Sequence, residues 1–242
     1  MMELFGVKFT GKFADEIEAA RKRNEARAAE IGSEEYERQR EEERQKVLWD
    51  GYVNGLVRTA KRVVGDRFRD ATFGNFGVND NNREAYEKCM ALVKDFSPDK
   101  RGIMLTGNNG IGKNHLAAAT HIALAGQGIH TYYNNITGIK NTICDNFEED
   151  GVEDAVRRII NAQFIVINDL GAESDTKFAK ELMFHLVDRI YEARRVLMIT
   201  TNILDGDELE SRYDRRVISR ILGMCDPVCY EDYDHRIVGN VG

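Results

Sequence analysis

The sequence predicts an α/β fold in which a parallel sheet carries helices on both faces, preceded by a helical N-terminal arm. From about residue 100, short apolar runs alternate with helical patterns, and such alternation implies a parallel sheet with right-handed crossovers. A glycine-rich turn joins the first apolar run to a helix. The 242 residues also exceed the ~100 to 200 typical of one domain. We therefore expect an arm over 1–62 and a three-layer domain over 63–242.

The arm is predicted from charge and helix propensity. Residues 14–46 contain 11 acidic and 8 basic residues and almost no large apolar ones, a composition that favours helices with opposite charges at helical spacing. Gly32 and Ser33 predict a break and a new helix start. Two interpretations stay open. The arm is either a solvated helical face without a partner, or a docking arm that binds another protein through apolar residues at its ends, among them Val47, Leu48, Trp49 and Tyr52.

The elements of the second domain follow from their periodicity. Short runs rich in apolar or aromatic residues predict strands, and fully apolar runs such as 164–167 are typical of strands buried in a parallel sheet. The expected strands are 102–106, 129–134, 164–167 and 196–199, and the expected helices are 115–125, 136–147, 152–161, 176–194 and 212–222.

Composition and charge exclude several classes of protein. No apolar run approaches the ~18 residues that span a bilayer, and the first thirty residues carry charges instead of a signal-type core. We therefore expect a cytoplasmic protein with no membrane partner and reduced cysteines. Cys225 and Cys229 have no second Cys/His pair at zinc spacing, so we expect buried apolar residues there and not a zinc site. The formal net charge of -7 argues against a surface that grips nucleic acid everywhere, but it leaves room for a local basic groove.

A phosphate-binding loop is the strongest chemical signal. The loop follows a predicted strand and opens a predicted helix, so its backbone N–H groups and the positive helix terminus can hold phosphates, while Lys113 reaches the β and γ phosphates. We expect the nucleotide, ATP, to contact Gly107, Asn108, Asn109, Gly110, Ile111, Gly112, Lys113, Asn114 and His115.

The positions that normally hold Mg²⁺ are altered. Asn114 stands where a Ser or Thr hydroxyl ligates the metal, and Asn168 stands at the acidic position that ends the strand 164–167. Asp169 keeps the carboxylate that orients or activates water. Because Mg²⁺ demands near-ideal octahedral geometry, we expect Asn114, Asn168 and Asp169 to form only a weak Mg²⁺ site, with slow hydrolysis or none.

Several ordered motifs resemble a known family. Asp169 to Glu173 (DLGAE), Ile199 to Asn202 (ITTN), Arg216 to Arg220 (RVISR), Asp234 to Arg236 (DHR) and the stretch from Gly65 to Phe76 are similar to segments of the DnaC/DnaI helicase loaders and the related IstB transposition ATPases, all AAA+ proteins. The resemblance covers about residues 63–237. It implies an AAA+ P-loop NTPase core for 63–242.

The resemblance also implies roles for single residues. Asn202 corresponds to sensor 1, which reads the γ phosphate. Arg220 corresponds to the arginine finger, which reaches the nucleotide of a neighbouring subunit, and Arg236 corresponds to sensor 2. Asp169, Asn202 and Arg220 are thus the expected catalytic residues. Phe73 and Phe76 either flank the adenine or belong to the core.

The partners implied by the resemblance are a hexameric replicative helicase, single-stranded DNA, and further copies of the chain in a spiral on the helicase. The candidate DNA contacts combine aromatic rings with positive charge, although tyrosines on a strand also serve as packing residues. They are Tyr132, Tyr133, Lys140, Arg157 and Arg158.

Three functions are compatible with these patterns. The first is an ATP-binding loader that delivers a hexameric replicative helicase to single-stranded DNA, with hydrolysis weakened by Asn114 and Asn168. The second is an IstB-like transposition ATPase, a class that is generally more basic than this chain. The third is a nucleotide-binding interaction protein that has lost hydrolysis.

Overall fold

The computed structural model describes residues 2–4, 7–9, 12–145 and 151–232. The chain divides into two compact units, Met1–Tyr52 and Val53–Gly242. Among the described helices, none is long and apolar enough to cross a membrane.

The first unit contains a short antiparallel pair, β1 (Met2–Leu4) and β2 (Val7–Phe9), followed by α1 (Lys12–Ile31) and the first part of α2 (Ser33–Val63). The predicted break is confirmed, because Gly32 separates the two helices with a φ of 84°, a conformation that costs glycine little. Ion pairs between residues three or four apart, such as Glu18–Lys22 and Arg21–Glu25, support the exposed helices weakly. Because α2 continues through Val63, the division at residue 62 stays a prediction.

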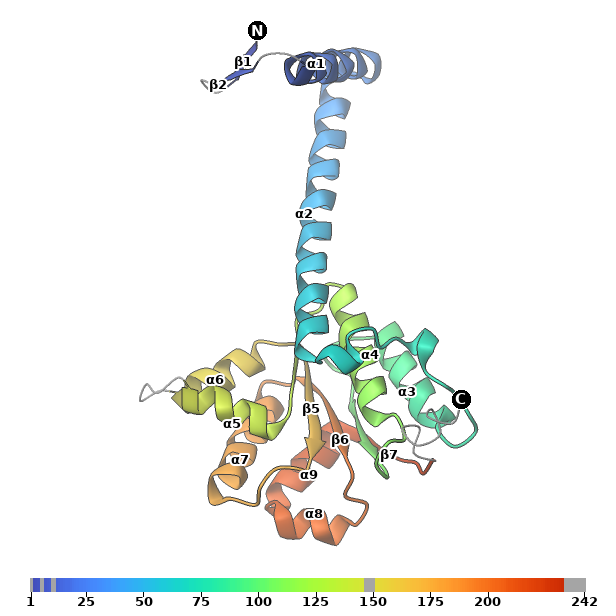
Figure 1. The fold of residues 1–242 in the computed structure, drawn as a ribbon, viewed down its shortest axis with the longest axis vertical. Helices are drawn as coiled ribbons and strands as arrows, with labels where there is room; N and C mark the ends of the chain where they lie inside the picture. Colours follow the sequence, from blue (N-terminus) through green and yellow to red (C-terminus); the bar gives the residue numbers. More distant parts are fainter. Residues whose placement is uncertain (1, 5–6, 10–11, 146–150, 233–242) are drawn as a thin grey trace. The chain divides into compact units, whose positions relative to one another are not determined.

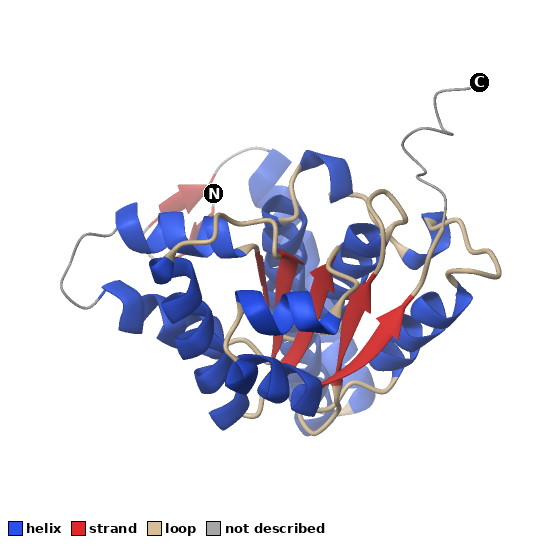
Figure 2. Cartoon of the chain, turned by 90° about the horizontal axis from the view of Figure 1, so that it is seen from below, coloured by secondary structure: helices blue, strands red, loops and turns tan. Residues whose placement is uncertain are grey.

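The second unit contains a five-stranded parallel sheet in the order β4-β5-β6-β3-β7 (Figure 2). Its strands are β3 (Gly102–Thr106), β4 (Thr131–Asn134), β5 (Phe164–Leu170), β6 (Val196–Thr201) and β7 (Cys225–Cys229). The first four were predicted, but β7 was not. Its Pro227 lies on an edge strand, where a missing N–H is tolerated.

Helices cover both faces of this sheet (Figure 1). Successive strand residues point to opposite faces, so Ile165 and Ile167 belong to one hydrophobic cluster and Val166 to the other. The helices are α3 (Arg83–Lys94), α4 (Lys113–Gly126), α5 (Ile136–Asp145), α6 (Gly151–Ile160), α7 (Lys177–Glu192), α8 (Gly206–Arg212) and α9 (Arg215–Met224). The three-layer prediction is therefore confirmed.

The start of one predicted helix was wrong, and one short helix was missed. The helix expected over 212–222 is α9, which begins at Arg215 after an Asp214 cap, and the separate α8 before it was not predicted. The helix expected over 176–194 is confirmed as α7, and Thr176 is its N-cap because the Thr176 side-chain oxygen accepts from the Ala179 N–H at 3.2 Å. The predicted end of the 136–147 helix lies outside the described residues.

Candidate functional site

The glycine-rich loop connects β3 to α4 in the conformation that phosphate binding requires. Gly110 and Gly112 have φ values of 79° and 93°, which few other residues adopt. A Cβ on Gly112 would lie only 2.6 Å from Cε2 of Phe76. The loop therefore needs glycine there for both its backbone and its packing, and it leaves the N–H groups at the start of α4 directed at the site.

Lys113 lies across this loop. Its Nζ donates to the carbonyl oxygens of Gly107 at 2.7 Å and Asn108 at 2.6 Å, and only 4% of the residue is exposed. These carbonyls hold the ammonium beside the position that phosphates take in such loops. Ile111 is fully buried in the core, so it can offer a nucleotide only its backbone.

A closed polar network occupies the expected metal site. Asn114 Nδ2 donates to both carboxylate oxygens of Asp169, at 3.1 and 2.9 Å, and Asn168 Nδ2 donates to Asp169 Oδ2 at 3.0 Å. A carboxylate only accepts hydrogen bonds, which fixes both amide nitrogens toward it. The amide oxygens of Asn114 and Asn168 then face the Thr200 hydroxyl, at 3.0 and 2.9 Å.

The same network holds Asp169 in an unusual backbone conformation. Its φ is 52°, in a region that is uncommon for residues other than glycine and that clusters at functional sites. The Asp169 N–H donates to Thr200 Oγ1 at 2.9 Å. Thr200 is thus central to the site, although only Asn202 of the same motif was assigned a role from the sequence. Its position near the end of a buried strand, two residues before Asn202, was the available signal.

Two adjoining pockets lie over the loop. One of about 270 Å³ is lined by residues that the sequence predicted, namely Asn109, Gly110, Gly112, Lys113, Asn114, His115, Asp169 and Asn202, and also by Arg67 and Phe68. The structure thus brings the loop, Asp169 and Asn202 together. Arg67 and Phe68 come from the short 3-10 helix η1 (Asp66–Phe68) and were missed.

The second pocket, of about 340 Å³, has aromatic walls suited to a planar base. Phe76 and His115 line it, with ring centroids 5.4 Å apart. His115 Nε2 lies 2.9 Å from the carbonyl oxygen of Thr72. Phe73 instead packs edge-on against Tyr86 at 5.8 Å. Of the two phenylalanines, therefore, Phe76 lines the pocket and Phe73 belongs to the adjacent core.

The predicted arginines lie elsewhere. Arg220 is on α9, where its Nη2 contacts Asp188 Oδ1 at 2.8 Å, and it does not line either pocket over the loop. Arg236 lies outside the described residues.

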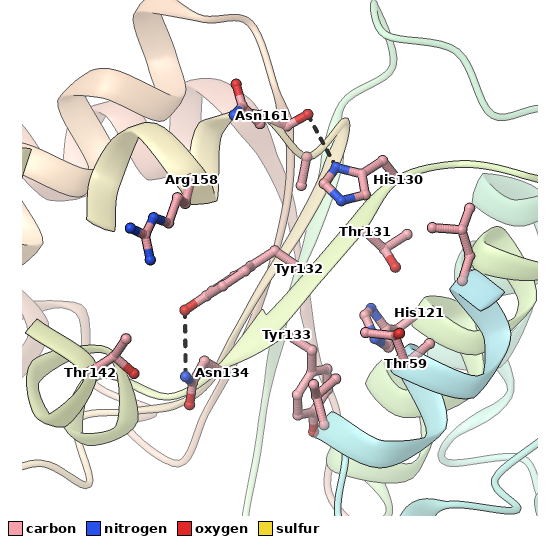
Figure 3. Close-up of a pocket in the computed structure, with 14 residues that line it drawn as sticks. Thr59, His121, His130, Thr131, Tyr132, Tyr133, Asn134, Thr142, Arg158 and Asn161 are labelled. Atoms are coloured by element: carbon pink, nitrogen blue, oxygen red, sulfur yellow. Dashed lines mark hydrogen bonds between the residues drawn. The ribbon is translucent and has the colours of Figure 1, made fainter. Parts of the chain in front are cut away.

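The candidate DNA contacts are only partly brought together. Tyr132, Tyr133 and Arg158 line a separate cavity of about 720 Å³ at the edge strand β4, where the two tyrosines point to opposite sides of the strand (Figure 3). Lys140 instead lies 6.0 Å from the Phe178 ring, and Arg157 pairs with Asp154 at 3.3 Å.

Burial governs protonation on the α4 side of this cavity. Burial lowers the pKa of His121 to about 3, so the imidazole is neutral near pH 7. Both its ring nitrogens are buried without a hydrogen-bond partner among the described residues. Burial, followed by the charge of Asp169, raises the pKa of Tyr133.

Comparison with known proteins identifies the family. The family model described as "IstB-like ATP binding protein" matches residues 66–223, more than half of the chain. The chain belongs to the IstB-like ATP-binding protein family. This range contains the loop, Asp169, Asn202 and Arg220.

Proteins similar to this chain include helicase loaders. The replicative helicase loader DnaC of Escherichia coli (strain K12) is 26% identical over 156 residues, which cover 63% of this chain and 63% of that protein. DnaC of Buchnera aphidicola subsp. Acyrthosiphon pisum (strain APS) is 24% identical over 173 residues, covering 66% of this chain and 69% of that protein. The chain thus spans about 63% of the length of the E. coli relative.

Solved structures agree with an AAA+ fold. A DnaC helicase loader structure superposes with a TM-score of 0.61 at 25% identity, covering 69% of this chain and 99% of that chain. The DnaI structure gives 0.59 at 19% identity, covering 66% and 91%. DnaA bound to AMPPCP and single-stranded DNA gives 0.60 at 18%, covering 70% and 51%. The AAA+ fold and the resemblance to the DnaC/DnaI clade are therefore confirmed.

Proposed function

We propose that this chain is an ATP-binding helicase loader that acts in DNA replication and delivers a hexameric replicative helicase to single-stranded DNA in the cytoplasm. The observation that carries the proposal is the nucleotide site: a glycine-rich loop, Lys113, Asp169 and Asn202 around one pocket, in a chain whose core superposes on nearly the whole of a DnaC helicase loader structure.

ATP is the proposed cofactor because the two pockets over the loop match the two halves of a nucleotide. The phosphates would lie against the loop backbone and Lys113, and the base would lie near Phe76 and His115. The clade assigns Arg236 to the same phosphates.

The residues at the expected metal position do not fit a Mg²⁺ ion as they stand. An octahedral Mg²⁺ site needs oxygen ligands, whereas both oxygens of Asp169 face amide N–H groups and the amide oxygens face Thr200. The Mg²⁺ set Asn114, Asn168 and Asp169 therefore supports ATP binding that depends little on the metal, and slow hydrolysis.

The arm supplies the proposed docking surface for the helicase. On α2 the side chains of Val47, Leu48, Trp49 and Tyr52 are between 50% and 71% exposed. A run of large exposed apolar side chains is a typical protein-binding feature. Copies of the chain would then assemble in a spiral on the helicase, with Arg220 of one copy at the nucleotide of the next.

The proposal is tested by the mass in solution of this protein mixed with the replicative helicase of its own source, with and without ATP. A helicase-sized complex that gains several copies of the chain is the expected result, and Lys113→Ala serves as the nucleotide-binding control. If the two proteins stay separate in both conditions, the loader function is wrong.

A second candidate is favoured by the amide network itself. A nucleotide-binding interaction protein without hydrolysis would use the same pockets and the same closed Asn114–Asp169–Asn168 contacts. An IstB-like transposition ATPase, the other alternative, would bind a transposase and duplex DNA instead of a helicase. Single-turnover ATP hydrolysis distinguishes the loader, which hydrolyses ATP slowly, from the interaction protein, which does not hydrolyse it. Binding to a helicase or to a transposase distinguishes the loader from the transposition ATPase.

A further inference from the structure

Asp188 and Arg220 form an ion pair between two neighbouring helices. Arg220 Nη2, on α9, lies 2.8 Å from Asp188 Oδ1, on α7, and the two side chains are only 32% and 29% exposed. Arg220 Nη1 also donates to the carbonyl oxygen of Arg216 at 3.3 Å. The guanidinium lies 5.9 Å from the centroid of the Tyr191 ring. These contacts hold a side chain that would otherwise sample many rotamers.

The hydrogen-bond inventory of Arg220 leaves part of its fork for another acceptor. A guanidinium has five N–H donors. Asp188 takes one on Nη2, the Arg216 carbonyl takes one on Nη1, and Nε is buried without a hydrogen-bond partner in the described structure. Among the described contacts, one N–H of each Nη has no acceptor, so the guanidinium keeps donors with which it can bind a phosphate.

Arg216, one turn earlier on the same helix, is held differently. Its Nε and Nη2 contact both carboxylate oxygens of Asp214, at 3.0 and 3.1 Å, and its guanidinium lies 4.9 Å from the Phe184 ring centroid. Asp214 is the cap of α9 itself, so this pair lies at one end of a single helix. Arg220, in contrast, takes its orientation from α7, which leads into β6 and thus toward Thr200 and Asn202.

We propose that Asp188 is a positioning residue that orients Arg220 toward the nucleotide of a neighbouring copy of this chain. The proposal rests on the proposed function, in which Arg220 acts as the arginine finger. Asp188 touches no nucleotide. It fixes the orientation of the Arg220 guanidinium in each separate copy. Formation of the interface therefore does not have to restrict this side chain further.

The test uses Asp188→Ala, Asp188→Asn and Arg220→Ala in the full chain, with Glu192→Ala as the matched control. Glu192 is also on α7 and also pairs with an arginine, Arg189, at 3.1 Å, but that arginine has no proposed role. Single-turnover ATP hydrolysis and ATP-dependent self-association are measured on the same samples, and thermal unfolding checks that each variant folds.

Asp188→Ala is expected to lower the rate of single-turnover ATP hydrolysis by up to about 100-fold, the cost of misplacing a reacting group by about 1 Å. Asp188→Asn keeps an acceptor oxygen and is expected to retain part of the signal. The double variant with Arg220→Ala should be no weaker than Arg220→Ala alone, and Glu192→Ala should match the unaltered chain.

Mixing variants tests whether Asp188 acts through the arginine across an interface. Lys113→Ala copies lack a functional nucleotide site but carry an oriented Arg220. They should restore hydrolysis when mixed with either Asp188→Ala or Arg220→Ala copies, whereas mixing the latter two should restore nothing. If Asp188→Ala hydrolyses ATP at the full rate while Arg220→Ala hydrolyses it slowly, the positioning role of Asp188 is overturned and the role of Arg220 is not. If Arg220→Ala hydrolyses ATP at the full rate, both the positioning role of Asp188 and the arginine-finger role of Arg220 are overturned.

Discussion

Replacing the two amide side chains with a hydroxyl and a carboxylate is the most direct test of the interpretation of the Mg²⁺ position. The change is Asn114→Thr together with Asn168→Asp. It removes the Nδ2 donors that contact Asp169 at 2.9 to 3.1 Å and places a second carboxylate beside the first. Two unit charges about 4 Å apart repel by roughly 4 kcal/mol at an effective dielectric constant of about 20. Without metal, the double variant should therefore be less stable than the unaltered chain.

The size of the effect follows from linkage. In a unit of this size 1 kcal/mol changes the Tm by about 2 to 4 °C, so the Tm of the double variant in EDTA should fall by roughly 10 °C. A cation present at about 100 times its Kd returns about 2.7 kcal/mol, so Mg²⁺ should recover roughly 5 to 10 °C. The unaltered chain, which has no such repulsion, should have nearly the same Tm in EDTA and in Mg²⁺.

The assay combines thermal unfolding with ATP binding and single-turnover hydrolysis, each in EDTA and in Mg²⁺. ATP should bind the unaltered chain with little dependence on Mg²⁺, and the double variant should hydrolyse ATP about tenfold faster or more once the metal is bound. Fast Mg²⁺-dependent hydrolysis by the unaltered chain, abolished by Asp169→Ala, would refute the reasoning.

Three further predictions concern other parts of the molecule. Lys113→Ala should abolish ATP binding in calorimetry while the circular dichroism spectrum stays unchanged; retained binding would contradict the phosphate-loop assignment. Trp49→Ala should leave the Tm unchanged, because the side chain is 54% exposed, but weaken helicase binding by about 1 to 3 kcal/mol in a titration against the helicase; an unchanged affinity would remove Trp49 from the docking surface. Burial lowers the pKa of His121 from 6.5 to about 3, so between these pH values the unfolded chain binds a proton that the folded chain does not. The free energy of unfolding should therefore fall by about 1.4 kcal/mol for each unit by which the pH is lowered from 6.5 to 3. Urea unfolding of His121→Gln should lack this part of the slope, and equal slopes would contradict the assignment.

The elements that position the nucleotide site were predictable because their signals are local. Ile165 to Ile167 is a continuous apolar run, and Gly110 and Gly112 precede a helix-forming stretch, so strand, loop and helix each follow from neighbouring residues. The strand β7 lacks such a signal. It contains Asp226 and Pro227, and its side chains alternate poorly between buried and exposed. An edge position, which the sequence does not reveal, makes that composition acceptable.

The contacts within the site were less predictable because they join distant segments. Thr200 reaches Asn114 across 86 residues of chain and Asn168 across 32. Arg67 comes to the phosphate loop from a helix of three residues that has no periodic pattern. Motif spacing predicted that Asn114, Asn168 and Asp169 belong to the nucleotide site. Their hydrogen bonds to one another were not predictable, because these depend on which atoms the fold brings within 3.1 Å.

The geometry makes the two asparagines one unit with a single consequence. Asn168→Asp alone would place a carboxylate next to Asp169 Oδ2, where the amide nitrogen now lies at 3.0 Å. Asn114 would remain as the main donor to both oxygens of Asp169. Asn114→Thr alone would remove the donor that spans both oxygens of Asp169 without supplying a second acid for a cation. Because the two changes share a partner, their effects on stability and on Mg²⁺ binding should be non-additive, by about 0.5 to 3 kcal/mol. Without bound metal, the presence of one asparagine thus favours an asparagine at the other position as well. Binding of Mg²⁺ requires both positions to change together.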